Sequence, residues 1–291
     1  MTIDSSDLIA RTPRPRTRIS LAADLRALGL EAGMTVIVHS SLSRMGWVNG
    51  GALAVVLALQ DVLTAAGTLV MPAHSGGISD PAQWRRPPVP AEWIDEVRAT
   101  MPPYDPALSP TRGIGIIPEY FRTLPGVLRS AHPMGSFAAW GHHAAFITGN
   151  HSLECELGER SPLGKIYALD GQVLMIGTGY DTNTSFHLGE AHVPNAPQTS
   201  VSTCVVREGQ AAWVSYIDVD YSADDFDRIG ADFEASHPDR VQIGLVGSAE
   251  TRLFRQRSAV DFAREWLLRH RPGWGLVPPA DAPTGGPSPQ P

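Results

Sequence analysis

The stretch that most limits how this chain can fold is residues 34–73, where strand-like and helix-like patterns alternate. The β-branched run MTVIVHS (34–40) suits a buried strand, and a glycine-containing loop follows it. A helix is then expected from about residue 51 to residue 66, before a second apolar run, GTLVMPA (67–73). A strand, a crossover helix and another strand form a βαβ unit, in which the strands lie parallel and helices cover the sheet. The sequence therefore predicts an α/β fold.

The rest of the chain continues this alternation around one long irregular segment. Helices are expected at 19–29, 115–124 and 256–270, and strands at 137–141, 171–179 and 200–207. Residues 74–112 contain eight prolines and little periodicity, which favours a lid or a substrate loop. We expect a flexible N-terminal arm over 1–18, a single domain over 19–271 and a disordered, Pro/Gly-rich tail over 272–291.

Charge and apolar content narrow the class of function. The formal net charge of -7 argues against nucleic acid, which needs a clustered basic surface, and is compatible with a cationic ligand. No apolar run approaches the roughly 20 residues that cross a bilayer, and the polar first residues, MTIDSSDLIA, do not form a secretory signal. Cys155 and Cys204 make neither a metal spacing nor a disulfide framework, so both are expected as reduced thiols. These features predict a cytoplasmic protein without a membrane or nucleic-acid partner.

The loop after the first strand, HSSLSRMGWVNGG (39–51), has the composition of an anion site. Gly46, Gly50 and Gly51 let the backbone come close to a ligand because they lack a Cβ atom. Asn49 can cap the following helix, whose free N–H groups attract anions. Serine hydroxyls at positions 40, 41 and 43 add donors, although the segment is neither a P-loop nor a G-x-G-x-x-G motif. We interpret the loop as a site for a pyrophosphate-bearing cofactor, with a purely structural tight turn as the alternative.

The densest cluster of reactive side chains is TGYDTNTSFHLGEAH (178–192), which follows an apolar strand-like run. α/β proteins place their sites at such strand ends. If a helix begins near Asp181, His187 and Glu190 share one face, where the carboxylate can orient an imidazole that accepts a proton from an amine. A capped helix with a half-buried histidine is the alternative. A zinc site is disfavoured because His187 and His192, five residues apart, do not share a helical face.

Other histidines and candidate nucleophiles carry weaker signals. His74 and His132 each adjoin a strand-like run, but a structural role is favoured for a single histidine of this kind. The chain has no G-x-S-x-G motif, and the acidic surroundings of Cys155 in ECELGER make its thiol a poor nucleophile. A covalent enzyme intermediate is therefore disfavoured, and direct transfer between two bound substrates fits the sequence better.

Five blocks, in order, give the chain a wider resemblance: VIVHSSLSRMGWVNGG (36–51), GTLVMPAHS (67–75), SPTRGIGIIPEYFR (109–122), RSAHPMGSFAAWG (129–141) and SPLGKIYALDGQVLMIGTGYDTNTSFHLGEAH (161–192). Over about residues 20–270 the chain resembles the aminoglycoside 3-N-acetyltransferase family. The resemblance implies a three-layer α/β/α sandwich with a largely central sheet and long substrate loops. It also implies acetyl-coenzyme A as the acyl donor and a cationic small molecule, an aminoglycoside, as the acceptor. Direct transfer to the 3-amino group would confer antibiotic resistance; an oligomer is possible and no metal is expected.

The resemblance also assigns roles to individual residues. It implies His187 as the catalytic base, with Glu190 and Asp181 beside it. The residues expected to contact the acyl donor are His39, Ser40, Ser41, Gly46, Val48, Gly50, Gly51, Ser109 and Thr111. The residues expected to contact the acceptor are His74, Tyr104, Asp105, His132 and Glu190. Acidic side chains in the variable regions 76–108 and 208–240 suit a cation, although a solvated surface explains them equally well.

Three other readings of the sequence remain open. The acceptor can be another small amine, acylated from the same donor. The protein can be a hydrolase in which His187 activates water, or a catalytically silent protein that binds a coenzyme or an antibiotic. Within the resemblance itself, Gly189 stands where many members of the family have alanine, at a helix contact.

Overall fold

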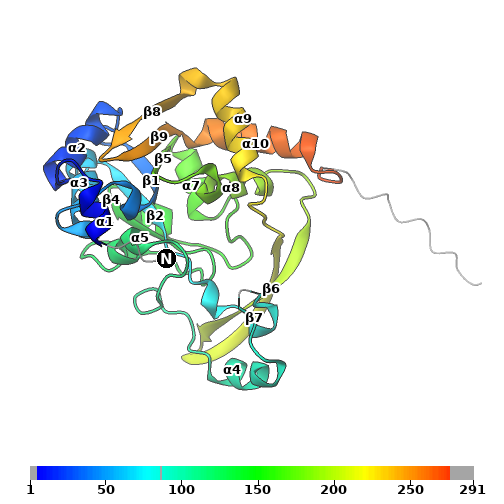
Figure 1. Ribbon diagram of the computed structural model, residues 1–291. Helices are drawn as coiled ribbons and strands as arrows, with labels where there is room; N and C mark the ends of the chain where they lie inside the picture. Colours follow the sequence, from blue (N-terminus) through cyan, green and yellow to red (C-terminus); the bar gives the residue numbers. More distant parts are fainter. Residues whose placement is uncertain (1–4, 86, 276–291) are drawn as a thin grey trace, which may run out of the picture.

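The computed structural model describes residues 5–85 and 87–275, and in them seven strands form one mixed sheet in the order β3-β4-β2-β1-β5-β9-β8. Two further strands, β6 and β7, pair with each other in a separate sheet. The strands are β1 (Thr35–Ser40), β2 (Thr68–Pro72), β3 (Leu128–Arg129), β4 (Phe137–Gly141), β5 (Gln172–Ile176), β6 (Gln198–Arg207), β7 (Gln210–Val219), β8 (Val241–Val246) and β9 (Ala249–Arg255). Strands from both ends of the chain therefore meet in one sheet (Figure 1).

Helices connect and cover these strands. They are α1 (Ser5–Ala10), α2 (Arg18–Ala27), α3 (Gly51–Leu63), α4 (Ile94–Thr100), α5 (Ile116–Phe121), α6 (Ala144–Thr148), α7 (Pro162–Ala168), α8 (Ser185–Ala191), α9 (Phe226–Ser236) and α10 (Gln256–His270). The centre of the sheet is parallel, because β1 pairs in parallel with β2 on one side and with β5 on the other. Its flanks are antiparallel, through β4 and β9. The predicted α/β class is confirmed, and α3 is the crossover helix between β1 and β2.

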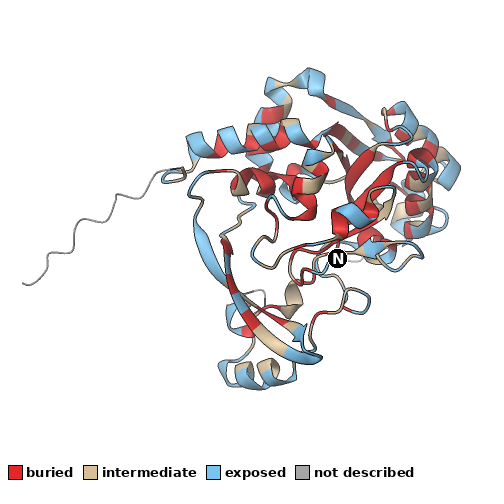
Figure 2. Cartoon of the chain, turned by 180° about the vertical axis from the view of Figure 1, so that it is seen from behind, coloured by how far each residue is buried: buried red, intermediate tan, exposed pale blue. Residues whose placement is uncertain are grey.

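Two hydrophobic cores lie on opposite faces of the sheet, because successive strand residues point to opposite sides. Val36 and Val38 of β1 pack with apolar residues of α2 and α3. Ile37, between them, belongs to the second core, which α7, α8, α9 and α10 complete. Buried residues accordingly concentrate in the central strands and on the inner faces of these helices (Figure 2). This arrangement confirms the three-layer α/β/α sandwich.

A close helix contact holds the α8 layer in place. A Cβ atom at Gly189 would come within 2.9 Å of the Ala263 Cβ atom and 3.1 Å of the Val260 carbonyl oxygen on α10. Glycine at this position therefore lets α8 lie directly against α10. The departure from alanine noted in the sequence has a packing reason here.

The β6–β7 hairpin and α4 form a lobe that projects from the sandwich (Figure 1). The hairpin holds the segment between β2 and α5 by backbone hydrogen bonds, in which Asp80 N donates to Ser202 O and Tyr104 N donates to Cys204 O. Trp213 Nε1 on β7 donates to the Arg98 carbonyl oxygen at 2.9 Å. The segment predicted as an irregular lid or substrate loop thus contains a short helix and is fixed against a hairpin of which only the first strand was predicted.

The N-terminal segment contacts the loop after β1. Arg16 N donates to Trp47 O, Asn49 N donates to Arg16 O, and Trp47 N donates to the Thr12 hydroxyl oxygen. These bonds and α1 lie within the region predicted as a flexible arm, whereas most of the predicted tail falls on 276–291, outside the described residues. No helix in the described part of the chain is long and apolar enough to cross a membrane.

Candidate functional site

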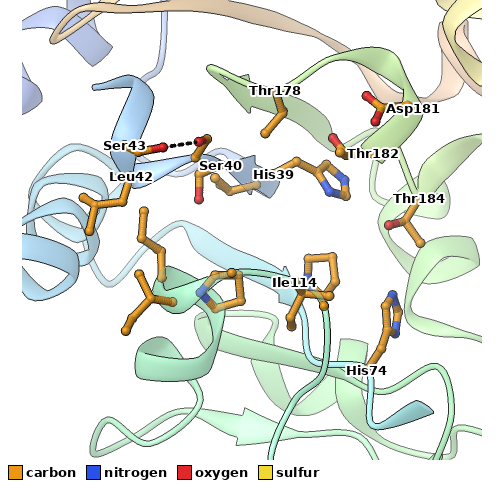
Figure 3. Close-up of a pocket in the computed structure, with 18 of the residues that line it drawn as sticks. His39, Ser40, Leu42, Ser43, His74, Ile114, Thr178, Asp181, Thr182 and Thr184 are labelled. Carbon is orange, nitrogen blue, oxygen red and sulfur yellow. Dashed lines mark hydrogen bonds between the residues drawn. The ribbon is translucent and has the colours of Figure 1, made fainter. Parts of the chain in front are cut away.

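A cavity of about 710 Å³ opens where the parallel strands β1, β2 and β5 end. This edge of the sheet is the usual ligand site of open α/β folds. The cavity is lined by Leu8, Val38, His39, Ser40, Ser41, Leu42, Ser43, Pro72, His74, Gly113, Ile114, Gly115, Ile116, Ile117, Pro118, Thr178, Asp181, Thr182 and Thr184. Figure 3 shows His39 and His74 reaching into the same space from β1 and from the segment after β2, with Thr182 and Thr184 on the facing wall.

Two buried imidazoles give this cavity polar groups without internal partners. Burial lowers the pKa of His39 to about 4, and burial, reinforced by nearby histidines, lowers the pKa of His74 to about 3. Both rings are therefore neutral at neutral pH. His39 Nε2 and His74 Nδ1 are buried and have no hydrogen-bond partner among the described residues. Unsatisfied buried nitrogens are costly, so both are available to a ligand.

His187 and Glu190 lie one turn apart on α8 and form the closest histidine–carboxylate pair of the site. His187 Nδ1 is 2.6 Å from Glu190 Oε2, and the Glu190 side chain is fully buried. The other carboxylate oxygen accepts hydrogen bonds from Arg271 Nη1 and from the Ser222 backbone N–H. The guanidinium of Arg271 compensates the buried negative charge, which fixes the carboxylate in place.

The ring of His187 is held from its sides as well as from Nδ1. Its centroid lies 4.6 Å from that of Phe226 and 5.3 Å from that of Tyr221. Within the described chain, Nε2 makes no hydrogen bond. Since Nδ1–H donates to Glu190, the unshared electron pair of the neutral ring lies on Nε2. The geometry provides a proton acceptor with a defined tautomer.

The His187 pair lies close to the cavity described above. Thr184 lines the cavity, and its carbonyl oxygen accepts the hydrogen bond of His187 N at the start of α8. His187 is also near enough to contribute to the lowered pKa of His74, after the larger effect of burial. The edge of the sheet therefore places the predicted base beside a ligand-sized space.

The residues predicted to hold the acyl donor do not all meet in one place. His39, Ser40 and Ser41 line the cavity, and Gly46 lines a neighbouring one. Val48, Gly50 and Gly51 border neither of these two cavities; Val48 is buried in the core beside α3, and both glycines begin α3 with φ of 85° and 56°.

Two further residues of the donor set are engaged within their own segment. The Ser109 hydroxyl accepts a hydrogen bond from Asp105 N at 3.0 Å. The Thr111 hydroxyl donates to Glu119 Oε2 at 2.6 Å. Both lie beside the 113–118 wall of the cavity without lining it.

The residues predicted to contact the acceptor also separate into two groups. His74 lines the cavity, whereas Tyr104 donates its hydroxyl to the Ser130 carbonyl oxygen and Asp105 accepts from the N–H groups of Ala107 and Leu108. These two side chains serve as internal hydrogen-bond partners of their loops.

His132 is fully buried and satisfied inside the protein. Its Nδ1 accepts from Gly135 N at 3.0 Å, and its Nε2 donates to the Leu153 carbonyl oxygen at 3.1 Å. The ring stacks on His151 with centroids 4.7 Å apart. This is the structural role that the residue pattern by itself favoured.

An acidic pair lies on the far side of Tyr221 from His187. The Tyr221 hydroxyl is 3.5 Å from Asp218 Oδ1, and Asp218 Oδ2 accepts from Glu156 N. Burial, together with the charge of Asp218, raises the pKa of Glu156 to about 8. Of the acidic residues in the variable regions, Asp218 therefore belongs to a buried group near the site.

Sequence reasoning missed the groups that reach His187 and Glu190 from distant segments. Arg271 and Ser222 hold Glu190, and Tyr221 and Phe226 hold the imidazole. None of them belongs to a motif, and only their folded positions identify them. In the described residues, no group of three or more His, Cys, Asp or Glu side chains is arranged to hold a metal ion.

The fold and this edge of the sheet define an α/β protein with a histidine–glutamate pair beside a ligand-sized cavity. The family model for aminoglycoside 3-N-acetyltransferases matches residues 37–268. The chain belongs to this family and is an acyltransferase.

Individual relatives agree over nearly the whole chain. The SPbeta prophage-derived aminoglycoside N(3')-acetyltransferase-like protein YokD of Bacillus subtilis (strain 168) is 47% identical over 90% of this chain and 96% of its own length. Aminoglycoside N(3)-acetyltransferase VII of Streptomyces paromomycinus is 36% identical over 91% and 96%.

Solved structures share the fold. The crystal structure of the Bacillus subtilis YokD protein matches with a TM-score of 0.89, over 91% of this chain and 98% of that one. The structure titled "AAC-IIIb binary with CoASH" matches at 32% identity with a TM-score of 0.78, over 91% and 100%. "AAC-VIa bound to Sisomicin" matches at 32% identity with a TM-score of 0.79, over 89% and 100%.

Proposed function

We propose that the protein transfers an acetyl group from acetyl-coenzyme A directly to an amine of an aminoglycoside, at its 3-amino group, with His187 as the general base. The observation that carries the proposal is the 2.6 Å contact between His187 Nδ1 and the buried, arginine-compensated carboxylate of Glu190. A base oriented in this way suits deprotonation of an amine during its attack on a thioester.

His187 and Glu190, both on α8, accept and stabilise the proton that the acceptor amine loses during the transfer. As the acceptor nitrogen bonds to the acetyl carbonyl carbon, His187 Nε2 takes the proton that the nitrogen loses. Glu190 stabilises the imidazolium that results, and Arg271 keeps Glu190 in its orientation. The carbon–sulfur bond then breaks, the acetyl group stays on nitrogen, and the coenzyme leaves as a thiol after His187 returns the proton to its sulfur. Asp181 lines the cavity but contacts neither member of the pair, so we assign it no proton transfer.

The cavity supports the assignment of the donor. The Ser40 hydroxyl and the Thr178 hydroxyl are buried without partners in the described chain, and both line the cavity. Together with Ser41 and Ser43 they form a polar wall suited to the amides of a pantetheine arm. The CoASH-bound relative supports the same class of donor.

The acidic pair supports a cationic acceptor. Asp218 and Glu156 lie near Tyr221, which packs against His187. Because the pKa of Glu156 is raised to about 8, the two carboxyl groups share a proton at neutral pH, and their remaining negative charge favours a cationic acceptor near the base. The sisomicin-bound relative supports aminoglycosides as the acceptor class. Resistance of the host to such antibiotics would follow from modification of the amine.

A covalent acetyl-enzyme is not part of the proposal. The Cys155 thiol accepts from Arg160 N, and the Cys204 thiol lies in the hairpin lobe and donates to the Met101 carbonyl oxygen. Burial raises the pKa of Cys204, which disfavours its thiolate. Direct transfer in a ternary complex remains the simplest route.

Thiol release from acetyl-coenzyme A, followed with and without kanamycin- or gentamicin-like amines, tests the proposed function. We expect thiol release that depends on the amine, with a mass gain of one acetyl group on the antibiotic. Thiol release without an amine would identify a hydrolase. Release only with small non-antibiotic amines would replace the acceptor class, and binding of the donor without release would identify a silent binding protein.

A further inference from the structure

His39 and His74 are two histidines of the cavity at the ends of β1, β2 and β5 that take no part in the proposed proton transfer. His39 lies near the end of β1, and His74 follows β2 by two residues. Since these strands are parallel neighbours, their ends bring both side chains to one edge of the sheet. Both rings reach into the same space, which Thr182 and Thr184 face from the other wall (Figure 3). The edge therefore offers two imidazoles to one ligand.

The two imidazoles lie on the face of the sheet that α8 covers. Side chains alternate along a strand, so His39 shares its face with Ile37, which belongs to the core that α8 completes. The ring of His74 packs edge to face against Phe137 of the same core, with centroids 5.2 Å apart. His39 and His74 are therefore on the side of the sheet that carries His187.

Two buried ring nitrogens of this pair have no partner within the protein. His39 Nε2 and His74 Nδ1 make no hydrogen bond in the described part of the chain. His132 and His151 are buried as well, yet both nitrogens of each ring are hydrogen-bonded to protein groups. Burial by itself thus does not leave a histidine of this molecule unpaired. Since an unpaired buried polar group is costly, the two nitrogens at the cavity indicate a polar group of a ligand.

Both rings are neutral, which determines the chemistry that they can support. Burial lowers the pKa of His39 to about 4. For His74, burial and then the charges of His187 and His39 lower the pKa to about 3. A neutral imidazole still has one N–H group to donate, and unlike an imidazolium it neither repels a cationic acceptor nor reduces the basicity of His187. The pair supplies hydrogen-bond donors beside the base without added charge.

His74 lies close to the base as well as to His39. The charge of His187 has the largest charge effect on the pKa of His74, and the charge of His39 has the next largest. A thioester carbonyl oxygen beside the base gains negative charge when an amine attacks the carbon, and donors aimed at such an oxygen commonly make the largest single contribution to catalysis. His187 and Glu190 act on the proton of the amine and provide no donor for this oxygen. The two free N–H groups are suited to that task.

We propose that His74 Nδ1–H and His39 Nε2–H bind the carbonyl oxygen of the acetyl thioester and stabilise the negative charge that it gains. This inference rests on the proposed function, because it requires an acetyl thioester beside His187. As the amine nitrogen bonds to the carbonyl carbon, the carbonyl electron pair moves onto the oxygen, which the two N–H groups hold without giving up their protons. When the carbon–sulfur bond breaks, that pair re-forms the carbonyl group and sulfur keeps the bonding pair. His39 and His74, which the family resemblance assigned to the donor and to the acceptor, thus meet at the group that passes between them.

Matched amide substitutions test these two donors in the full chain. The side-chain amide nitrogen of Asn can occupy the position of a histidine Nδ1, and that of Gln the position of Nε2. His74→Asn and His39→Gln therefore keep a donor in place, whereas His74→Gln and His39→Asn displace it and His74→Leu and His39→Leu remove it. We expect the leucine variants and the displaced amides each to lower kcat by about 10²- to 10³-fold, the usual cost of losing one such donor. The matched amides should recover at least about tenfold of this loss.

Two further measurements show whether the loss arises at the carbonyl group. Calorimetry with coenzyme A, which lacks the acetyl carbonyl, should give the same Kd for every folded variant. Isotope-edited infrared spectroscopy of bound acetyl-coenzyme A should show the carbonyl absorption below its frequency in free solution, and the leucine variants should move it back toward that frequency. His142→Leu is the control, because His142 is exposed and lines neither cavity at this edge of the sheet, and it should keep its kcat.

The outcomes separate this inference from the proposed function. If the unaltered protein acetylates an amine and the folded leucine variants keep their kcat, His39 and His74 are not the oxyanion donors. A weaker Kd for coenzyme A that accounts for the whole loss would also overturn the assignment. Equal rates in the matched and displaced amides would do the same, and this comparison remains decisive if a leucine variant does not fold. If the unaltered protein releases no thiol with any amine, the proposed function itself is wrong and the inference falls with it.

Discussion

The buried histidines of the 129–156 region and His187 on α8 differ in how their ring nitrogens are used. In the 129–156 region, His132 and His151 use all four ring nitrogens in hydrogen bonds within the protein. On α8, His187 uses Nδ1 toward Glu190 and leaves Nε2 without a protein partner in the described chain. An open nitrogen held in a fixed tautomer distinguishes a candidate base from a structural histidine, whereas burial and neighbouring sequence do not.

The largest effect that this comparison predicts is on turnover at His187. We expect His187→Ala to reduce the rate of acetyl transfer by about 10² to 10⁴, the usual contribution of a general base. Steady-state kinetics with acetyl-coenzyme A and an aminoglycoside measures the loss, and calorimetry should show that acceptor binding persists. Turnover close to that of the unaltered enzyme would remove His187 from this role.

Replacement of the structural histidine His132 is expected to lower stability and to leave turnover unchanged. His132→Ala leaves the Gly135 N–H without its acceptor and opens space beside His151, so unfolding in urea should show a loss of about 2–4 kcal/mol. The folded fraction should keep its KM and kcat, measured where the variant is fully folded. A raised acceptor KM with normal stability would instead support the acceptor contact that the family resemblance assigned to His132.

Local features of the fold and the site could be predicted from the sequence, whereas contacts between distant segments could not. The βαβ unit and the His187–Glu190 pair were predictable, because periodicity and three-residue spacing are local properties. Arg271 lies 81 residues from Glu190 and carries no pattern that indicates their contact. Gly50 and Gly51 do carry a pattern, the backbone freedom typical of an anion site, but that pattern does not reveal their location. They lie at the start of α3 and line neither of the two cavities.

The hairpin lobe was only half predicted for a related reason. Strand β7 alternates buried Val214, Tyr216 and Asp218 with more exposed neighbours, which is a strand pattern. The acidic residues of 208–240 were compatible with either a cation site or a solvated surface, and one of them, Asp218, is buried beside Glu156. Because the charged Asp218 occupies a buried position of β7, the alternation of apolar and polar residues is interrupted in the sequence. Its partner, Glu156, is identified only in the folded structure.

The histidines also predict how stability depends on pH. Burial lowers the pKa values of His39 and His132 to about 4 and those of His74 and His151 to about 3, against about 6.5 in an unfolded chain. The unfolded state then binds more protons below pH 6.5, so stability is complete above that pH and falls as the pH drops toward 4.

Urea midpoints between pH 4 and pH 7.5 measure this slope. Glu156 acts in the opposite direction, because a raised pKa of about 8 lowers stability as the pH rises from about 4.5 to 8. Four histidines should outweigh one carboxylate below pH 6.5. Unchanged or higher stability at pH 4.5 would contradict neutral, buried rings, and a Glu156→Gln variant should gain stability at pH 8 relative to the unaltered chain.

The smallest effect on turnover is expected when the two cysteines are replaced. The Cys155→Ser, Cys204→Ser double variant should keep most of its turnover, because neither sulfur lines the cavity that borders His187. Cys204 is buried in the lobe against Met101, so its replacement should cost some stability while leaving kcat unchanged. Intact-mass measurement after exposure to acetyl-coenzyme A alone should show no added acetyl group. An acetylated protein that passes its acetyl group to the amine would establish a covalent relay, and His187 would then serve a nucleophile instead of the acceptor.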